Sequence, residues 1–207
     1  GIVFALVSGL SGITVLSAAF PTYLPAILGL ATLFWYNVIY TPLKKITAYA
    51  IFPGAMVGAL PPLIGWTAAG GALTDYRIIL LAFFFFVGQI PHFWLILLRY
   101  GKEYEAAGFR SITSYLSVIR IARLSMVWIA ATSMSAILLA IFGVARHPVM
   151  QSGILGMSVA LPLVAGAFLI ANRQDNHKVT FLTINLYYLV MMLLLIADAL
   201  VSGGLVR

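Results

Sequence analysis

The stretch that decides the fold is Phe83 to Phe109, FFFFVGQIPHFWLILLRYGKEYEAAGF. It begins as an apolar run of membrane-spanning character and acquires Gln89, Pro91 and His92 while still within that run. Charged residues follow, including two of the five acidic residues in the whole chain. Polar and titratable groups are costly at membrane depth, and by default they mark a functional site. We therefore expect any chemistry of this protein at this membrane boundary.

The composition is that of an integral membrane protein. Hydrophobic residues make up 63% of the 207 residues and charged residues only 8%, whereas a soluble domain has about 25% charged residues. Long unbroken apolar runs favour helices over a β-barrel. The absence of cysteine excludes disulfides, thiolate nucleophiles and thiolate metal sites. The net charge of +7 indicates cytoplasmic loops and not nucleic acid, because no basic stripe interleaved with aromatic residues accompanies it.

Seven stretches are long and apolar enough to span a bilayer. They run approximately over residues 1–19, 22–40, 48–69, 78–98, 121–144, 151–171 and 179–201. The sequence thus predicts an all-α, polytopic transmembrane bundle in a single membrane-embedded domain, residues 1–207. The third stretch is rich in Pro and Gly, and two interpretations stay open: a kinked packing helix, or a helix broken to shape a cavity.

Lysine and arginine are distributed unevenly between the two sides of this bundle. Arg77, Arg146 and Arg207 fall on one side. Nine fall on the other: Lys44, Lys45, Arg99, Lys102, Arg110, Arg120, Arg123, Arg173 and Lys178. The positive-inside rule places the set of nine in the cytoplasm. Asp198, near the outer end of the last stretch, is expected to cap a helix or pair with a cation there.

The segment Thr41-Pro42-Leu43-Lys44-Lys45 has the pattern of a helix start, with Thr41 as N-cap and Pro42 as the first helical residue. Free N–H groups beside two ammonium groups form an anion site suited to phosphate. The alternative is a topology signal without a binding role.

His92 lies seven residues before Arg99, about 10 Å below the membrane boundary at 1.5 Å per residue. Three roles stay open for it: a proton carrier, a haem or metal ligand, or a hydrogen-bonded packing group. Glu103 and Glu105 are candidates for holding Mg²⁺ against a diphosphate. The alternative is a solvated loop in which these carboxylates and the neighbouring cations neutralise one another.

Two parts of the chain resemble a known family. YTPLKKIT, followed by GAMVGALPPLIGWTAA, resembles the corresponding stretch of protoheme IX farnesyltransferases, the haem O synthases among the UbiA-type intramembrane prenyltransferases. GQIPHF and KEYEAAGF are similar to that family's Q-x-P-H-F element and its acidic second motif, in the same order and spacing. The resemblance covers roughly Tyr40 to Phe109.

The resemblance implies a nine-helix fold, of which this chain matches the C-terminal seven helices and lacks the first Asp-rich motif. It implies transfer of farnesyl from farnesyl diphosphate to a vinyl group of haem B, with addition of water, to give haem O. Mg²⁺ is the implied cofactor, and haem B is a substrate. The implied setting is a bacterial inner membrane with the active-site loops in the cytoplasm, with haem A synthase or a second copy as partners. We expect these 207 residues alone to be inactive.

Position by position, the resemblance also implies roles for individual residues. Diphosphate contacts are implied for Tyr40, Lys44 and Lys45. Arg99 and Lys102 are further candidates for diphosphate binding, because they are cations beside the two glutamates at the membrane boundary. Catalytic roles are implied for His92 and Glu103, with Glu103 directed at Mg²⁺. Cavity walls are implied for Gln89, Phe93, Trp94 and Tyr104. The chain departs from the family pattern at Lys102, usually acidic, and at Arg110, which opens a run that in the family contains proline.

The residue types also fit this chemistry independently of the resemblance. Ionising an allylic diphosphate needs cations at the departing phosphates and a dry aromatic cavity for the carbocation. Trp35, Tyr36 and the Phe83–Phe86 run are further candidates for that cavity. Other interpretations are prenyl transfer to a different aromatic or tetrapyrrole acceptor, and a non-enzymatic transporter or assembly subunit.

Overall fold

The computed structural model describes residues 1–170 and 174–203, and within them it contains helices and no strands. The α-helices are α1 (Ile2–Ala19), α2 (Leu24–Phe34), α3 (Thr41–Ile46), α4 (Ile51–Ala68), α5 (Tyr76–Ala106), α6 (Val118–Ile141), α7 (Pro148–Ile170) and α8 (Gln174–Val201). A π-helical segment, Trp35–Tyr40, joins α2 to α3, and short 3₁₀ turns lie at Ala48–Ala50 and Ile112–Ser114.

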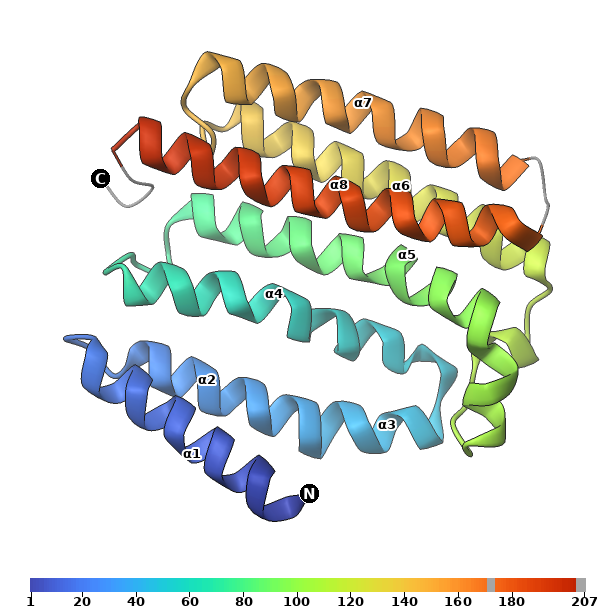
Figure 1. Cartoon of the computed structure of the whole chain (residues 1–207), viewed down its shortest axis with the longest axis horizontal. Coiled ribbons are helices and arrows are strands. Elements are labelled where there is room, and N and C mark those ends of the chain that lie inside the picture. The colour runs from blue at the N-terminus through green and yellow to red at the C-terminus, as the bar shows by residue number, and fades with distance from the viewer. Residues whose placement is uncertain (171–173, 204–207) are drawn as a thin grey trace.

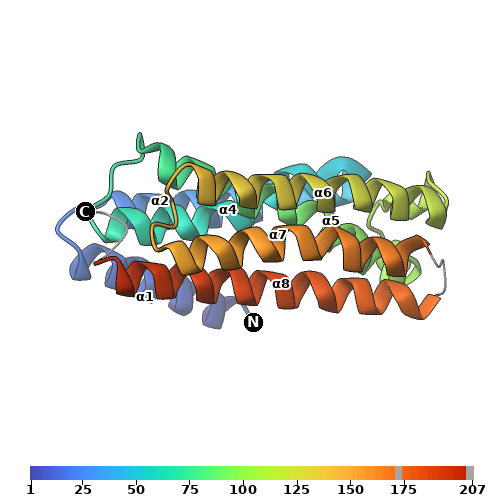
Figure 2. The same cartoon turned by 90° about the horizontal axis from the view of Figure 1, so that it is seen from above.

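The predicted all-α bundle of seven helices is confirmed, with α2, the π-helical segment and α3 forming one continuous helix. Six helical stretches of the described chain are long and apolar enough to cross a membrane, and Val3–Ala19 is a shorter apolar helix. Figure 1 shows the helices running side by side in alternating directions, with α5 near the centre of the array. In Figure 2, α1 and α8 both lie below the layer that contains α2 and α4, so the array is curved.

The main core lies on the α6–α8 side of α5. It contains Phe84 and Leu95 of α5 with buried residues from all three of those helices. Tyr188 of α8 approaches α5 so closely that its hydroxyl occupies the place of a Cβ on Gly88. Small residues permit this kind of close helix approach in membranes, and the contact fixes α8 against the middle of α5.

The two ends of the bundle differ in charge. One end carries residues 41–47, the segment 107–117 and the start of α8, and Figure 1 shows these at the right. We call this the basic end, because most of the predicted cytoplasmic set lies there; Arg173 of that set, and Arg207 of the opposing set, lie outside the described residues. Segments 20–23, 69–75 and 142–147 turn at the opposite end.

The opposite end is held by two aspartates. Asp198 is fully buried, and its Oδ1 accepts hydrogen bonds from the backbone N–H groups of Arg146 and His147, at 2.9 and 2.7 Å. The prediction that Asp198 caps or pairs there is confirmed. Asp75 caps the start of α5, and its hydrogen bonds with the Arg77 side chain hold its pKa below the usual range.

The predicted helix start at Thr41 is wrong. The chain stays helical from Leu24 to Ile46, and Thr41 donates its backbone N–H and its hydroxyl to the Tyr36 carbonyl. Pro42 has no N–H to donate, and the wider π turn just before it accommodates the missing backbone hydrogen bond. The N–H groups expected to bind phosphate are therefore not free at Thr41.

The prediction of a loop that begins at residue 99, directly after the fourth span, is also wrong. Helix α5 does not stop near residue 98 but continues to Ala106, so Arg99, Lys102 and Glu103 lie on its last turns and not in a loop. Pro91 lies inside this helix, and Pro61 and Pro62 lie inside α4, which is likewise unbroken. Of the two interpretations of the third stretch, the structure supports a continuous packing helix.

Candidate functional site

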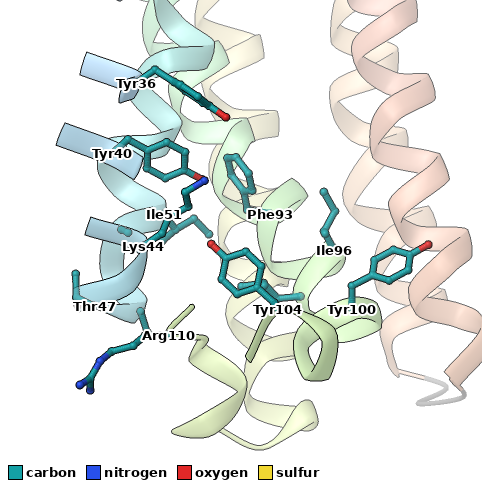
Figure 3. A pocket seen from close by; sticks show the side chains of 13 residues that line it. Tyr36, Tyr40, Lys44, Thr47, Ile51, Phe93, Ile96, Tyr100, Tyr104 and Arg110 are labelled. Atoms are coloured by element: carbon teal, nitrogen blue, oxygen red, sulfur yellow. The ribbon is translucent and has the colours of Figure 1, made fainter. Parts of the chain in front are cut away.

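An aromatic pocket opens at the basic end, between the α2–α3 helix and α5. It has a volume of about 290 Å³, and Figure 3 shows its lining side chains converging from the two helices. The α2–α3 helix contributes Tyr36, Tyr40 and Lys44, and α5 contributes Phe93, Ile96, Leu97, Tyr100 and Tyr104. Arg110 and residues just before α4 complete the wall.

The π-helical segment explains how one helix presents Tyr36, Tyr40 and Lys44 together. At 3.6 residues per turn, a residue eight positions along has rotated about 80° from the first. A π turn bonds i to i+5 and so holds more residues per turn, which offsets this drift between Tyr36 and Tyr40. The rings of Tyr36 and Tyr40 lie 5.6 Å apart, and Lys44 follows on the same face.

Tyr40 is held by the small residues of α4. Its side chain is buried, and its ring lies where a Cβ on Gly54 would be, with the nearest ring carbon at 2.5 Å. Next to it, the Trp35 indole N–H donates to the Pro53 carbonyl at 2.8 Å. Glycine at position 54 is therefore a requirement for the placement of Tyr40, whose ring also lies 6.5 Å from that of Phe93.

Lys44 supplies the positive charge of the pocket. Its ammonium nitrogen lies 4.8 Å from the ring centre of Tyr40, 5.3 Å from that of Phe109 and 5.8 Å from that of Tyr36. No carboxylate among the described residues pairs with it. Aromatic faces stabilise a cation while leaving its donors available for an anion, so Lys44 is suited to bind a phosphate group.

The segment after α5 contributes Arg110 to the pocket wall. The Arg110 N–H donates to the Lys44 carbonyl at 3.0 Å, which ties this segment to α3. The rings of Tyr104 and Phe109 lie 4.8 Å apart. The pocket is therefore built from three parts of the chain: the α2–α3 helix, α5 and the segment after it.

A second hollow, the apolar groove, lies between α4, α5 and α8. Its volume is about 610 Å³. Gln89 is the one polar side chain among its lining residues, and its amide packs against Gly58 of α4, where a Cβ would come within 2.9 Å of the amide nitrogen. The rest of the groove is formed by Leu81 and Phe85 of α5, by Pro61 and Pro62 of α4, and by Met192, Leu195, Ile196, Ala199 and Leu200 of α8.

The structure brings together five of the residues predicted for the site: Tyr36, Tyr40, Lys44, Phe93 and Tyr104. It places the others elsewhere. Gln89 lines the apolar groove, and Trp94 is buried in a core cluster against Trp128. Four charged side chains are exposed and outside the pocket lining: Lys45, Arg99, Lys102 and Glu103.

His92 lies on another side of α5 from the pocket. It is half-buried, and its ring lies 5.0 Å from that of Phe181 on α8. The neighbouring residue Phe93 points toward Tyr40 instead. Consecutive residues of a helix point about 100° apart, so the side chains of the Q-x-P-H-F element face different parts of the structure.

The described residues do not form a magnesium site by themselves. No group of three His, Asp or Glu residues comes together anywhere in the described part of the chain. Glu103 is exposed, and the Glu105 carboxylate accepts hydrogen bonds from Thr113 and Ser114. Mg²⁺ is commonly bound through one or two carboxylates, with substrate phosphates and waters as its other ligands, so Glu103 alone would supply only part of such a site.

Sequence reasoning did not assign Ile96, Tyr100 or Arg110 to the site. Ile96 and Tyr100 follow Phe93 at helical spacing, three and seven residues on, so the signal was present once the helix was known to continue past residue 98. Arg110 belongs to an irregular segment, and its placement depends on the backbone contact with Lys44.

Comparison with known proteins gives a consistent result. Residues 1–187 match the UbiA prenyltransferase family. The chain is 46% identical to protoheme IX farnesyltransferase of Geobacter sulfurreducens over 133 residues, 64% of this chain and 48% of that protein. It is 37% identical to protoheme IX farnesyltransferase of Oleidesulfovibrio alaskensis over 185 residues, 87% of this chain and 62% of that protein. The chain thus spans about half to three-fifths of the length of these relatives. No solved structure matches it significantly.

Proposed function

Because the chain belongs to the UbiA prenyltransferase family, we propose that it forms part of a membrane enzyme that transfers farnesyl from farnesyl diphosphate to haem B, producing haem O. The names of the relatives support this choice of donor and acceptor. The aromatic pocket is the structural observation that carries it. It combines an ammonium group that pairs with no carboxylate of the described residues, several aromatic faces and a position at the end of membrane-spanning helices.

Lys44 is the residue that we propose for the diphosphate. When the allylic C–O bond of the donor breaks, negative charge accumulates on the departing diphosphate. An ammonium group already held in place stabilises that charge without reorganisation. The rings around Lys44 exclude water and keep its charge in a less polar setting.

The aromatic rings have a second role in this proposal. The farnesyl cation that remains is stabilised by the negative faces of aromatic rings, and Tyr36, Tyr40, Phe93 and Tyr104 offer such faces within one pocket. A vinyl carbon of haem B then forms a bond to the allylic carbon. The resulting cation on the porphyrin side chain takes up water and releases a proton, which leaves the hydroxylated side chain of haem O.

Magnesium enters this proposal only as an expectation from the family. Glu103 is the residue in this chain to which that role was assigned, and its exposed position on the last turns of α5 leaves it free to meet a ligand at the basic end. The further oxygen ligands would come from the diphosphate and water, because the described residues contain no group of three metal-binding side chains.

We propose a bacterial inner membrane as the setting, with the basic end in the cytoplasm. The excess of lysine and arginine at that end supports this orientation. Farnesyl diphosphate carries a strongly charged headgroup, which would enter the pocket from the water on that side. Contact with haem A synthase, which would take up the product, or with a second copy stays a proposal of the same kind.

The test is haem analysis of membranes from cells that express the complete gene, in a host that makes no haem O. Chromatography and mass spectrometry should show haem O with the unaltered protein and none with Lys44→Ala at equal protein level. Haem B alone, from a well-folded protein, would overturn the haem assignment. Prenylation of another aromatic or tetrapyrrole acceptor in the same membranes would keep the transferase and change its acceptor.

A further inference from the structure

The carboxylate of Glu105 is the centre of a hydrogen-bond network in the segment that follows α5. Its Oε1 accepts from the Thr113 hydroxyl at 2.6 Å and from the Ser114 hydroxyl at 2.7 Å. The Ser111 hydroxyl lies 2.6 Å from that of Thr113 and also caps the turn Ile112–Ser114. Hydrogen bonds to a charged acceptor are about twice as strong as neutral ones, so Glu105 holds this segment on the end of α5.

The close fit between this segment and α5 depends on Gly101. A Cβ at that position would come within 2.8 Å of the Thr113 hydroxyl oxygen. Ser111 and Ile112 are buried at the same junction. The segment is thus anchored at residues 111–113 by packing and hydrogen bonds, while Arg110 and Tyr115 beside this anchor are exposed.

The other side of the segment reaches the pocket. The Arg110 N–H donates to the Lys44 carbonyl at 3.0 Å, and the Phe109 ring centre lies 5.3 Å from the Lys44 ammonium. Glu105 on α5 and the Lys44 carbonyl on α3 therefore fix the same short segment from opposite directions. Arg110 is itself the residue attached to the Lys44 carbonyl, three residues before the Glu105 contact at Thr113.

Arg110 lines the aromatic pocket, but its guanidinium group is only weakly bound by its neighbours. Its guanidinium donates one hydrogen bond, to the Tyr115 hydroxyl at 3.3 Å, and the side chain is exposed. In Figure 3 the guanidinium is turned outward, away from Lys44. A bond of this length is weak, and a phosphate offers two parallel bonds to the guanidinium in its place.

We propose, on the premise of the prenyl transfer above, that Arg110 is a second cation for the prenyl diphosphate and that Glu105 is its positioning residue. In this arrangement Lys44 binds the diphosphate from α3, and Arg110 leaves Tyr115 to bind it from the segment after α5. Glu105 touches no substrate. It acts by holding the segment that carries Arg110, which gives the two glutamates of the KEYE sequence separate roles.

The experiment measures KM and kcat for farnesyl diphosphate in the complete protein in membranes, together with binding of farnesyl thiodiphosphate, an analogue with a poor leaving group. Arg110→Gln should raise KM and weaken analogue binding about tenfold, the effect of losing bonds to a charged group, and Arg110→Lys should recover part of both. Arg120→Gln, which removes an exposed arginine outside the pocket, is the matched control and should change neither.

Glu105 is tested through its dependence on Arg110. Glu105→Ala should weaken analogue binding to a similar extent, and Glu105→Gln, which keeps an oxygen acceptor for Thr113 and Ser114, should recover it. The double variant Glu105→Ala/Arg110→Gln should bind no more weakly than Arg110→Gln alone. Additive losses, or wild-type binding by Arg110→Gln, would overturn the proposal.

Failure of the proposed function gives a different pattern. A protein that binds the analogue through Lys44 and Arg110 but makes no haem O supports the second cation and rejects the acceptor. A protein that makes haem O with unaltered KM in Arg110→Gln supports the function and rejects the second cation.

Discussion

The aromatic pocket and the apolar groove follow one another along α5 but differ in the ligand chemistry that they suit. Phe93 of the pocket and Gln89 of the groove are four residues apart, about one helical turn. The pocket has about 290 Å³ and a lysine among aromatic rings, whereas the groove has about 610 Å³ and almost no polar group. The fold thus separates a pocket suited to a charged group from a groove suited to a hydrocarbon chain.

This separation matches the donor that we propose. A prenyl diphosphate has a charged head and a long apolar tail, and a tail that starts at Lys44 has the groove as the next apolar hollow along α5.

Loss of the pocket's charge should have the largest effect. Lys44→Ala should lower kcat/KM for farnesyl diphosphate about 100-fold, the usual cost of removing one preorganised group that stabilises developing charge. Lys45→Ala is the matched comparison, because Lys45 is adjacent and exposed but lies outside the pocket lining. Rates in membranes with equal protein levels provide the measurement. Equal losses in the two variants would show that charge density at the basic end matters and the pocket does not.

Displacing Tyr40 should have the next largest effect. Gly54→Ala places a methyl group where the Tyr40 ring lies, which we expect to destabilise the protein by about 1–3 kcal/mol, as overpacking does, and to lower activity. Gly65→Ala is the control on the same helix, because a Cβ there meets nothing within 4 Å. Thermal unfolding in detergent measures the stability of the two variants, and rates in membranes measure their activity. If the Gly54 variant is as stable and active as the Gly65 variant, Tyr40 is not held by α4 as described.

The sequence predicted the bundle well because hydrophobicity alone determines which segments span a membrane. The seven helices were identified from apolar runs, and α1, α4 and α7 end within a few residues of the expected limits. The two wrong boundaries, at Thr41 and after Leu98, arise where helices continue into polar sequence. Composition marks the edge of the membrane there, whereas backbone hydrogen bonding decides where the helix ends.

The site was predictable only in part, because its residues are selected by the direction in which each side chain points. Tyr36 and Tyr40 share a face through a π turn that cannot be read from the sequence. His92 and Phe93 are adjacent in the chain yet contact α8 and Tyr40 respectively. Arg110 enters the site through a backbone hydrogen bond, which depends on position and not on residue type.

Filling the groove should have a smaller and more selective effect. Ala199→Trp puts a large ring at the end of the groove far from Gln89 and should lower kcat/KM for farnesyl diphosphate about fivefold more than for geranyl diphosphate, since an apolar pocket discriminates modestly by chain length. Leu193→Trp is the control, because Leu193 is exposed on α8 and outside the groove lining. Competition between the two donors in one assay measures the ratio. An unchanged ratio would place the tail elsewhere.

His92 should have the smallest effect on the donor. It lies against Phe181, on another side of α5 from Lys44, so His92→Ala should change KM for farnesyl diphosphate by less than about twofold, as expected for sites without shared partners. Any loss of activity in His92→Ala should appear as a lower kcat or a higher KM for haem B. This split decides which substrate the α8-facing side of α5 serves. A large rise in the KM for the donor, equal to that of Lys44→Ala, would mean that one substrate site extends around α5 and that the two sides of the helix do not act separately.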